Sequence, residues 1–149
     1  MEARTENLHA TAIAVAGRGV LLRGASGAGK SDLALRCLTL GAASDVPVPI
    51  ALVADDRVDV RRDGARLIMS APAALMGLIE VRGVGLVQLP ALTEAELALV
   101  VDLVAPAEVP RLPDAERTQV CGIGVPLLRL APFEPSAAAK VLIAATRLG

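Results

Sequence analysis

The segment 24–31 constrains the fold of this chain more than any other part of the sequence. It reads Gly-Ala-Ser-Gly-Ala-Gly-Lys-Ser and matches the phosphate-binding pattern G-x-x-x-x-G-K-[ST] at every defined position. A short apolar segment at 20–23 precedes it and predicts a strand, and a helical pattern of apolar residues begins at Lys30. Strand, glycine-rich loop and helix in this order are typical of a P-loop within an α/β fold.

Each residue type in this loop serves a separate chemical purpose. Glycines let successive backbone N–H groups point at phosphate oxygens, and the helix N-terminus adds partial positive charge. We expect Lys30 to contact the β- and γ-phosphates as a cation, and the Ser31 hydroxyl to complete a magnesium site. The alternative is a glycine-rich turn that matches by chance, which the flanking strand and helix disfavour. The predicted nucleotide-binding residues are Gly24, Ala25, Ser26, Gly27, Ala28, Gly29, Lys30 and Ser31.

The remaining pattern predicts mainly short strands. A hairpin is expected around Asp63-Gly64, a dipeptide that favours a tight turn between two strands. Segment 97–104 is apolar apart from Asp102 and fits either a strand or a buried helix. Together the segments predict an α/β fold with a mixed sheet. Strands or extended segments are expected at 8–16, 20–23, 50–53, 58–62, 66–70, 79–81, 86–89 and 125–130.

Two helices are predicted. The first begins at Lys30, and Gly41 is a natural residue just beyond its C-terminus. The second is expected to be capped by Ser136 and to run to about Arg147.

Composition places the chain among single-domain globular proteins. It has 149 residues, of which 54% are hydrophobic, with one Phe and no Trp or Tyr. Fifteen Lys and Arg against sixteen Asp and Glu leave no basic excess for nucleic acid or an anionic membrane. No secretory signal and no apolar run of membrane-spanning length are evident, so a cytoplasmic protein is expected. Cys37 and Cys121 are expected to be reduced core residues, although a disulfide between them stays open at this point.

Two adjacent carboxylates follow the apolar run at 50–54. Asp55 and Asp56 stand at a predicted strand end, where carboxylates in P-loop enzymes meet the metal or the attacking group. The alternative is a turn in which these side chains cap backbone N–H groups. Asp102 is a competing acid at another strand end, but the doublet follows the first helix more closely.

Some branches of the P-loop class are excluded. The only asparagine is Asn7, so the Asn-Lys-x-Asp motif that reads guanine in GTPases is absent. The Leu-Ser-Gly-Gly-Gln segment of transporter ATPases is absent as well. The sequence therefore favours a kinase.

Four segments together resemble the catalytic domain of HPr kinase/phosphorylase, a bacterial enzyme that phosphorylates a serine of the sugar-transport protein HPr. In order they are Leu8-His9, the loop 24–31, Val53-Ala54-Asp55-Asp56, and the run 79–85, which contains Glu-x-Arg-Gly-x-Gly. A weaker match is Val109-Pro110-Arg111-Leu112. The resemblance covers roughly residues 8 to 130. It implies an HPr kinase/PEP carboxykinase-like P-loop core with a mixed β-sheet, and a single catalytic domain over residues 1–149 without the N-terminal domain of many members.

The resemblance also implies the acid–base roles. Asp56 would take the proton from the target serine and, in the reverse reaction by phosphorolysis, return it to the departing oxygen. His9 would lie beside Asp56 and tune its protonation. Asp55 would orient the site.

Ligand roles follow from the same resemblance. Ser31, Glu80 and Asp55 would hold Mg²⁺, and Lys30 would neutralise the transferring phosphoryl group of ATP. Arg82 and Arg111 would contact the phosphoryl region or the partner protein. The expected partner is HPr, and a homo-oligomer, a hexamer by resemblance, is expected.

The expected function is thus an ATP-dependent protein-serine kinase acting on HPr in the regulation of carbohydrate metabolism. Two alternatives stay open: a small-molecule kinase on the same scaffold, and a non-catalytic module that senses ATP.

Overall fold

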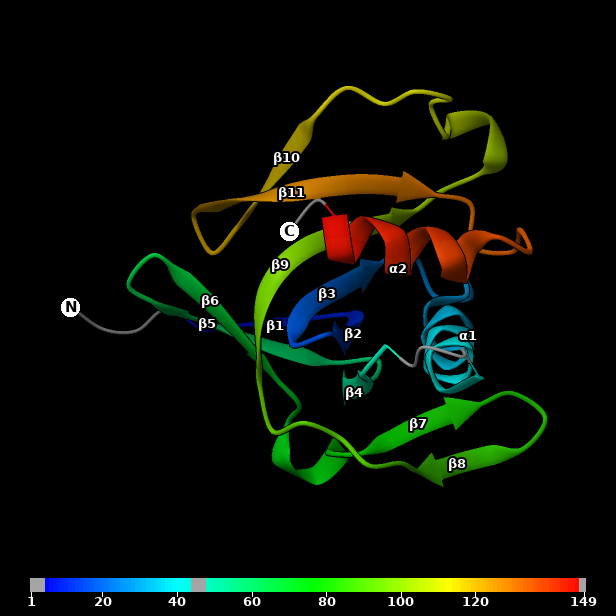
Figure 1. Ribbon diagram of the computed structural model, residues 1–149. Coiled ribbons are helices and arrows are strands. Elements are labelled where there is room, and N and C mark those ends of the chain that lie inside the picture. Colours follow the sequence, from blue (N-terminus) through cyan, green and yellow to red (C-terminus); the bar gives the residue numbers. More distant parts are fainter. Residues whose placement is uncertain (1–4, 44–47, 148–149) are drawn as a thin grey trace.

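The chain folds around one strongly curled mixed sheet with two helices on one of its faces (Figure 1). The computed structural model describes residues 5–43 and 48–147. The elements in chain order are β1 (Thr5–Leu8), β2 (Ala10–Val15), β3 (Arg18–Arg23), α1 (Lys30–Ala43), β4 (Ile50–Ala54), β5 (Val58–Asp63), β6 (Arg66–Ser70), η1 (Ala73–Leu75), β7 (Leu78–Val81), β8 (Gly85–Gln88), β9 (Ala95–Leu103), η2 (Pro106–Glu108), β10 (Glu116–Val120), β11 (Ile123–Leu130) and α2 (Ala137–Arg147). The predicted α/β fold with a mixed sheet is confirmed.

The long strand β9 joins the two halves of the sheet. Seven strands lie in the order β1-β5-β6-β9-β3-β2-β4. In addition, β11 pairs with β9, and β10 pairs with β11. β9 runs parallel to β3 and β11 and antiparallel to β6. Segment 97–104 fitted either a strand or a buried helix, and the hydrogen-bonded ladders show that its residues 97–103 belong to a strand.

Each face of the sheet packs against its own set of apolar residues. Strand side chains alternate between the faces, so Ile13 and Val15 contact the helix side, whereas Ala12 and Ala14 contact the other. On the helix side, α1 and α2 lie next to each other and cover the sheet (Figure 1). On the opposite side, the curled sheet packs against itself through mostly Ala, Val and Leu, so the core forms with few aromatic residues.

The prediction that the first helix ends before Gly41 is wrong, because α1 continues to Ala43. Gly41 is buried where the helix crosses β4. A Cβ added there would lie 2.4 Å from Cδ1 of Ile50 and 3.0 Å from the carbonyl oxygen of Val48. The glycine therefore permits close helix–sheet packing instead of ending the helix.

Other strand predictions need smaller corrections. The hairpin around Asp63-Gly64 is confirmed by the antiparallel pairing of β5 and β6. The extended segment expected at 8–16 is two strands, with His9 between β1 and β2. β10 was not predicted, because its charged and polar residues lie at an edge where few side chains are buried.

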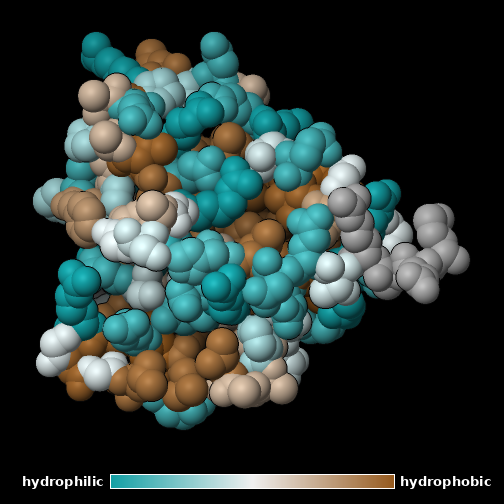
Figure 2. Space-filling view, turned by 180° about the vertical axis from the view of Figure 1, so that it is seen from behind, coloured by the Kyte–Doolittle hydropathy of each residue, from teal (hydrophilic) through white to brown (hydrophobic). Residues whose placement is uncertain are grey.

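The hairpin formed by β7 and β8 is a separate two-stranded sheet at one end of the molecule (Figure 1). Val84 and Leu86 are 76% and 73% exposed. Figure 2 shows hydrophobic atoms gathered at the lower end of the molecule, the end at which β7 and β8 lie in Figure 1.

The two cysteines are buried thiols on opposite faces of the sheet. Cys37 packs on the helix side and Cys121 on the other, so no disulfide joins them and the prediction of core cysteines is confirmed. None of the helices that the structure describes is long and apolar enough to cross a membrane.

Candidate active site

The P-loop joins β3 to α1, as predicted. Gly27 and Gly29 have φ angles of 80° and 93°, a backbone conformation that side chains with a Cβ rarely adopt. The N–H of Ala28 donates to the carbonyl oxygen of Ala25 at 2.9 Å, which tightens the loop. α1 begins at Lys30, so the partial positive charge of the helix N-terminus faces the loop.

The Lys30 side chain lies against the loop that precedes it. The residue is 7% exposed, and its Nζ donates hydrogen bonds to the carbonyl oxygens of Gly24 at 2.8 Å and Ala25 at 3.0 Å. These contacts hold an ammonium group where the P-loop pattern requires a phosphate-neutralising cation.

Four strands point their carboxyl ends at the same edge of the sheet. β9 and β11 run parallel to β3, and β4 has the same direction because β2 is antiparallel to both β3 and β4. β2 begins at this edge, next to His9. The ends of separate strands therefore bring the P-loop, His9 and the doublet Asp55-Asp56 together, at the place where open α/β sheets bind ligands.

Asp55 is the more buried member of the doublet, with 6% of its surface exposed. Its Oδ1 accepts hydrogen bonds from the hydroxyls of Thr11 at 2.9 Å and Ser31 at 2.5 Å. Its Oδ2 accepts from the backbone N–H of Glu80 at 3.1 Å. One carboxylate thus connects β2, the P-loop helix and the β7–β8 hairpin.

Asp56 has a different environment. Its side chain is 65% exposed, and its Oδ1 lies 2.8 Å from Nε2 of His9. Its φ of 65° lies in the left-handed region, and its carbonyl oxygen accepts a hydrogen bond from the N–H of Ala10 at 3.2 Å. The turn therefore directs two neighbouring carboxylates differently, one into the protein and one toward solvent and His9.

The competing acid, Asp102, is engaged elsewhere. Its two carboxylate oxygens accept from Nε and Nη2 of Arg23 at 2.7 and 3.0 Å. This two-point ion pair ties β9 to β3, and Asp102 does not line the cavity beside the P-loop. The geometry therefore favours the doublet, as the sequence did.

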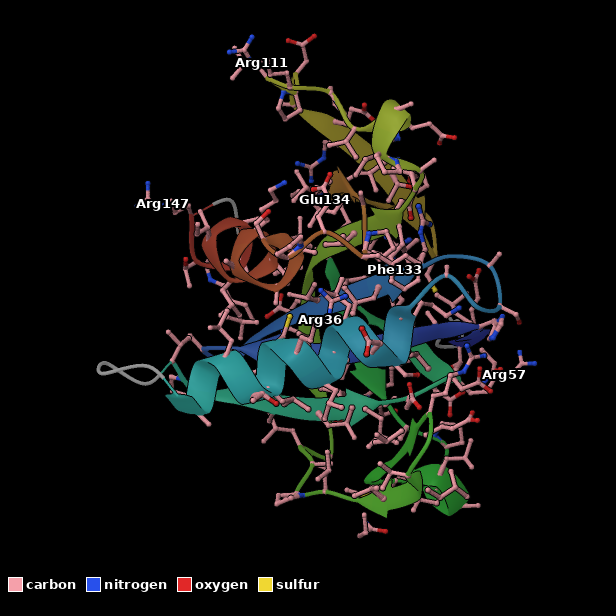
Figure 3. The ribbon with its side chains drawn as sticks, turned by 90° about the vertical axis from the view of Figure 1, so that its right-hand side faces the viewer. Arg36, Arg57, Arg111, Phe133, Glu134 and Arg147 are labelled. Carbon is pink, nitrogen blue, oxygen red and sulfur yellow. The ribbon has the colours of Figure 1, made fainter. Side chains whose placement is uncertain are left out.

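A cavity of about 550 Å³ opens beside the P-loop and brings most of the predicted residues together. Glu80 and Arg82 reach it from the β7–β8 hairpin. Arg111 does not line it and lies in the segment between η2 and β10, well away from Phe133 and Arg57 in Figure 3. The lining residues are His9, Ser26, Gly27, Gly29, Lys30, Ser31, Asp32, Leu35, Asp56, Glu80, Val81, Arg82 and Phe133.

Two residues of the site were missed by sequence reasoning. Thr11 is fully buried and bonds Asp55, and the one signal for it was a hydroxyl in an otherwise apolar strand. Phe133 lines the cavity from the segment after β11, and the signal for it was its being the chain's single aromatic residue.

The oxygen atoms near Ser31 suit a magnesium ion. Mg²⁺ prefers hard oxygen ligands and is commonly bound by one or two carboxylates together with substrate phosphate and water. The Ser31 hydroxyl is bonded to the Asp55 carboxylate, and Glu80 lines the same cavity. Among the residues that the structure describes, no three or more His, Cys, Asp or Glu side chains form a metal-binding group.

Comparisons with known proteins identify the family of the chain. The family model described as HPr Serine kinase C-terminal domain matches residues 2–147. An HPr kinase/phosphorylase of Lactobacillus delbrueckii subsp. bulgaricus is 37% identical over 135 residues, which are 83% of this chain and 40% of that protein. An HPr kinase/phosphorylase of Clostridium tetani is 40% identical over 85 residues, covering 57% of this chain and 25% of that protein.

A solved structure extends the likeness to the whole fold. The Hpr(Ser) kinase/phosphatase from Coxiella burnetii superimposes with a TM-score of 0.79 at 26% sequence identity, covering 96% of this chain and 97% of the other. The curated relatives are longer, and this chain spans about 40% of the length of the one from Lactobacillus delbrueckii subsp. bulgaricus.

Proposed function

Because the chain belongs to the HPr serine kinase C-terminal domain family, we propose that it transfers the γ-phosphoryl group of ATP to a serine of the protein HPr. The observation that carries this proposal is the pairing of Asp56 with His9, at 2.8 Å, in the cavity that Lys30 and the P-loop also line. A proton acceptor and a phosphate-binding loop thus face the same space.

The chemistry follows from this placement. The serine oxygen attacks the γ-phosphorus, and the bond from that phosphorus to the departing ADP oxygen breaks. The serine proton moves to the Asp56 carboxylate, which is exposed enough to meet an incoming protein side chain. His9 acts through Asp56 by holding its Oδ1. In phosphorolysis, an oxygen of inorganic phosphate attacks the phosphorus of the phosphoserine, the bond from that phosphorus to the serine oxygen breaks, and pyrophosphate forms. Protonated Asp56 gives its proton to the departing serine oxygen.

Neutralisation of the phosphate charge is the second contribution to catalysis that we propose. Phosphoryl transfer depends mainly on positioning and on electrostatic stabilisation of the phosphoryl oxygens. Lys30 and Arg82 are the cavity-lining cations available for this role. Ser31, Asp55 and Glu80 would hold Mg²⁺, which when bound offsets the negative charge of the phosphates. Arg111, exposed and outside the cavity, is proposed to contact the partner protein.

The test is transfer of labelled phosphate from γ-labelled ATP to purified HPr in the presence of Mg²⁺. The Asp56→Asn variant is expected to lose at least about a hundredfold in rate while still binding ATP. Asp63→Asn, at the β5–β6 turn, is the matched control and should keep the wild-type rate. Normal transfer by Asp56→Asn would refute the assigned base. Transfer to a metabolite but not to HPr would indicate a small-molecule kinase, and ATP binding without any transfer would indicate a sensing module.

We also propose that the chain forms a homo-oligomer. Exposed apolar side chains on the β7–β8 hairpin, Val84 and Leu86, support an association surface. Light scattering after size exclusion should report a mass above 15.2 kDa, and replacing both residues with serine should lower it. A monomeric wild-type mass would refute this proposal and leave the transfer reaction untouched.

A further inference from the structure

We propose that a second cavity, on the opposite side of the P-loop from the carboxylate doublet, receives the nucleobase and ribose of the nucleotide, with the Phe133 ring as the stacking surface. This proposal rests on the proposed function, because it takes the phosphates to lie in the P-loop.

The second cavity has a volume of about 570 Å³, which is in the range of small-molecule sites. Its walls are almost entirely alanine, proline and other apolar residues, and Glu134 is the one charged side chain among them. That carboxylate is bonded to Lys140 at 2.9 Å. An apolar cleft of this kind suits a flat, weakly polar ring such as a nucleobase. The lining residues are Ala28, Leu103, Val104, Ala105, Pro106, Ala131, Pro132, Phe133, Glu134 and Pro135.

The sheet topology determines which end of a nucleotide would reach this cavity. Segment 103–106 continues from the carboxyl end of β9, and segment 131–135 from that of β11. Both lie on the β9 side of the P-loop, whereas Asp55 and Asp56 follow β4 on the other side. A triphosphate whose γ end faces Asp56 can extend away from the doublet, toward β9 and β11, where this cavity lies.

Phe133 connects the two cavities. It lines both of them, and it is 70% exposed although it is the only aromatic residue of the chain. A Cβ added at Gly29 would lie 3.0 Å from the ring, so the ring rests directly against the P-loop. An exposed aromatic side chain beside a phosphate-binding loop is placed to stack on a base whose phosphates occupy that loop.

The segment that carries this ring is fixed to α1. Arg36 donates hydrogen bonds from its guanidinium to the carbonyl oxygens of Pro132 and Glu134, on either side of Phe133, and its Nε bonds Asp32 at 2.9 Å. Figure 3 shows Arg36, Phe133 and Glu134 grouped near α1. The ring is therefore held in place before any ligand arrives, which reduces the entropy lost on binding.

The experiment compares ATP with inorganic tripolyphosphate, which has the phosphate tail but no base. Calorimetry with Mg²⁺ should give wild-type protein about tenfold tighter binding of ATP. Phe133→Ala should remove that advantage and leave the affinity for tripolyphosphate unchanged. Ile143→Ala, which truncates a 55% exposed apolar residue of α2 outside both cavities, is the matched control and should bind both as the wild type does.

The outcomes separate the two proposals. Equal affinity of the wild type for ATP and tripolyphosphate would refute the base site and leave the phosphate site standing. Failure to bind either would refute the proposed function itself. A loss of tripolyphosphate affinity in Phe133→Ala would show that the ring supports the P-loop and does not stack on a base.

A second measurement locates the base without any variant. Photolabelling with 8-azido-ATP and Mg²⁺, followed by peptide mass spectrometry, should mark segments 103–106 or 131–135. Labelling confined to the β7–β8 hairpin would overturn the proposal. Stacking tolerates changes of base, so competition by GTP should match that by ATP within a few-fold.

Discussion

The hydroxyl of Ser31 donates to Oδ1 of Asp55 across 2.5 Å, although these residues follow β3 and β4, two strands that β2 separates. The contact reaches over the start of β2, where Thr11 donates to the same oxygen at 2.9 Å. Asp55 thereby links the P-loop helix to β2. Its neighbour Asp56, bonded to His9, is the more exposed carboxylate of the doublet.

The first prediction concerns Thr11, whose hydroxyl is buried and bonds Asp55. Thr11→Val keeps the shape but removes a hydrogen bond to a carboxylate, so the free energy of unfolding should fall by about 1.5–3 kcal/mol. Mg²⁺-dependent ATP binding should weaken as well, because Asp55 loses one of the groups that orient it. Urea denaturation and calorimetry measure the two effects. Thr39→Val, at an exposed position of α1, should change neither, and an unaltered Thr11→Val protein would contradict the orienting role.

The second prediction tests His9 as a positioning residue. His9→Ala removes the hydrogen bond to Oδ1 of Asp56, so kcat should fall about tenfold while KM for ATP stays constant. His9→Gln keeps an N–H donor and should recover part of the loss. Steady-state kinetics with HPr separates the two parameters. A higher KM with unchanged kcat would place His9 in nucleotide binding instead.

The third prediction concerns the packing of α1 on β4. Gly41→Ala would place a Cβ 2.4 Å from Cδ1 of Ile50, so the free energy of unfolding should fall by about 1–3 kcal/mol. Shortening the opposing side chain in the double variant Gly41→Ala/Ile50→Ala should make the combined loss smaller than the sum of the single losses. Strictly additive losses in urea denaturation would show that the two side chains do not meet.

The fourth prediction is a pH dependence of stability at the Cys37 thiol. Burial raises its pKa from 9.0 to about 12, against the opposing effect of the Arg36 guanidinium. Between these values the folded chain keeps a proton that the unfolded chain releases. The stabilisation is therefore complete below pH 9 and is lost as the pH rises toward 12, by at most about 1.4 kcal/mol per pH unit.

Denaturation of wild type and Cys37→Ala at pH 8 and pH 10.5 checks this dependence. The wild type should lose more stability than the variant on going to the higher pH. Parallel losses in the two proteins would assign the alkaline effect to other groups.

Local patterns were sufficient to predict the P-loop, the β5–β6 hairpin and the carboxylate doublet. In each case a few adjacent residues determine a backbone conformation or a strand end, so no distant partner is needed. Two adjacent carboxylates already suggested a division of roles, but which of them would take which role was predicted only through the family resemblance. The different environments of the two side chains accompany the φ of 65° at Asp56, which a local pattern does not reveal.

Features that depend on distant partners could not be derived in this way. The local sequence predicts a helix end at Gly41, and only the tertiary structure shows that this glycine packs against Ile50. In the sequence Thr11 is a single hydroxyl in an apolar strand, and its hydrogen-bond partner, Asp55, lies 44 residues later. Phe133 carries no motif, and its position beside Gly29 is visible only when β11 has been placed next to β9.

The pairing of β3 with β9 has a consequence for how the chain acquires its binding edge during synthesis. Arg23 and Asp102 are paired in that ladder and lie 79 positions apart in the sequence. Until β9 has been synthesised, β3, the strand that precedes the phosphate loop, therefore lacks one of its two neighbouring strands. Closing so long a loop is slow. We therefore expect the phosphate loop to become ordered only after β9 has been synthesised, when its pairing with β3 joins the two halves of the sheet.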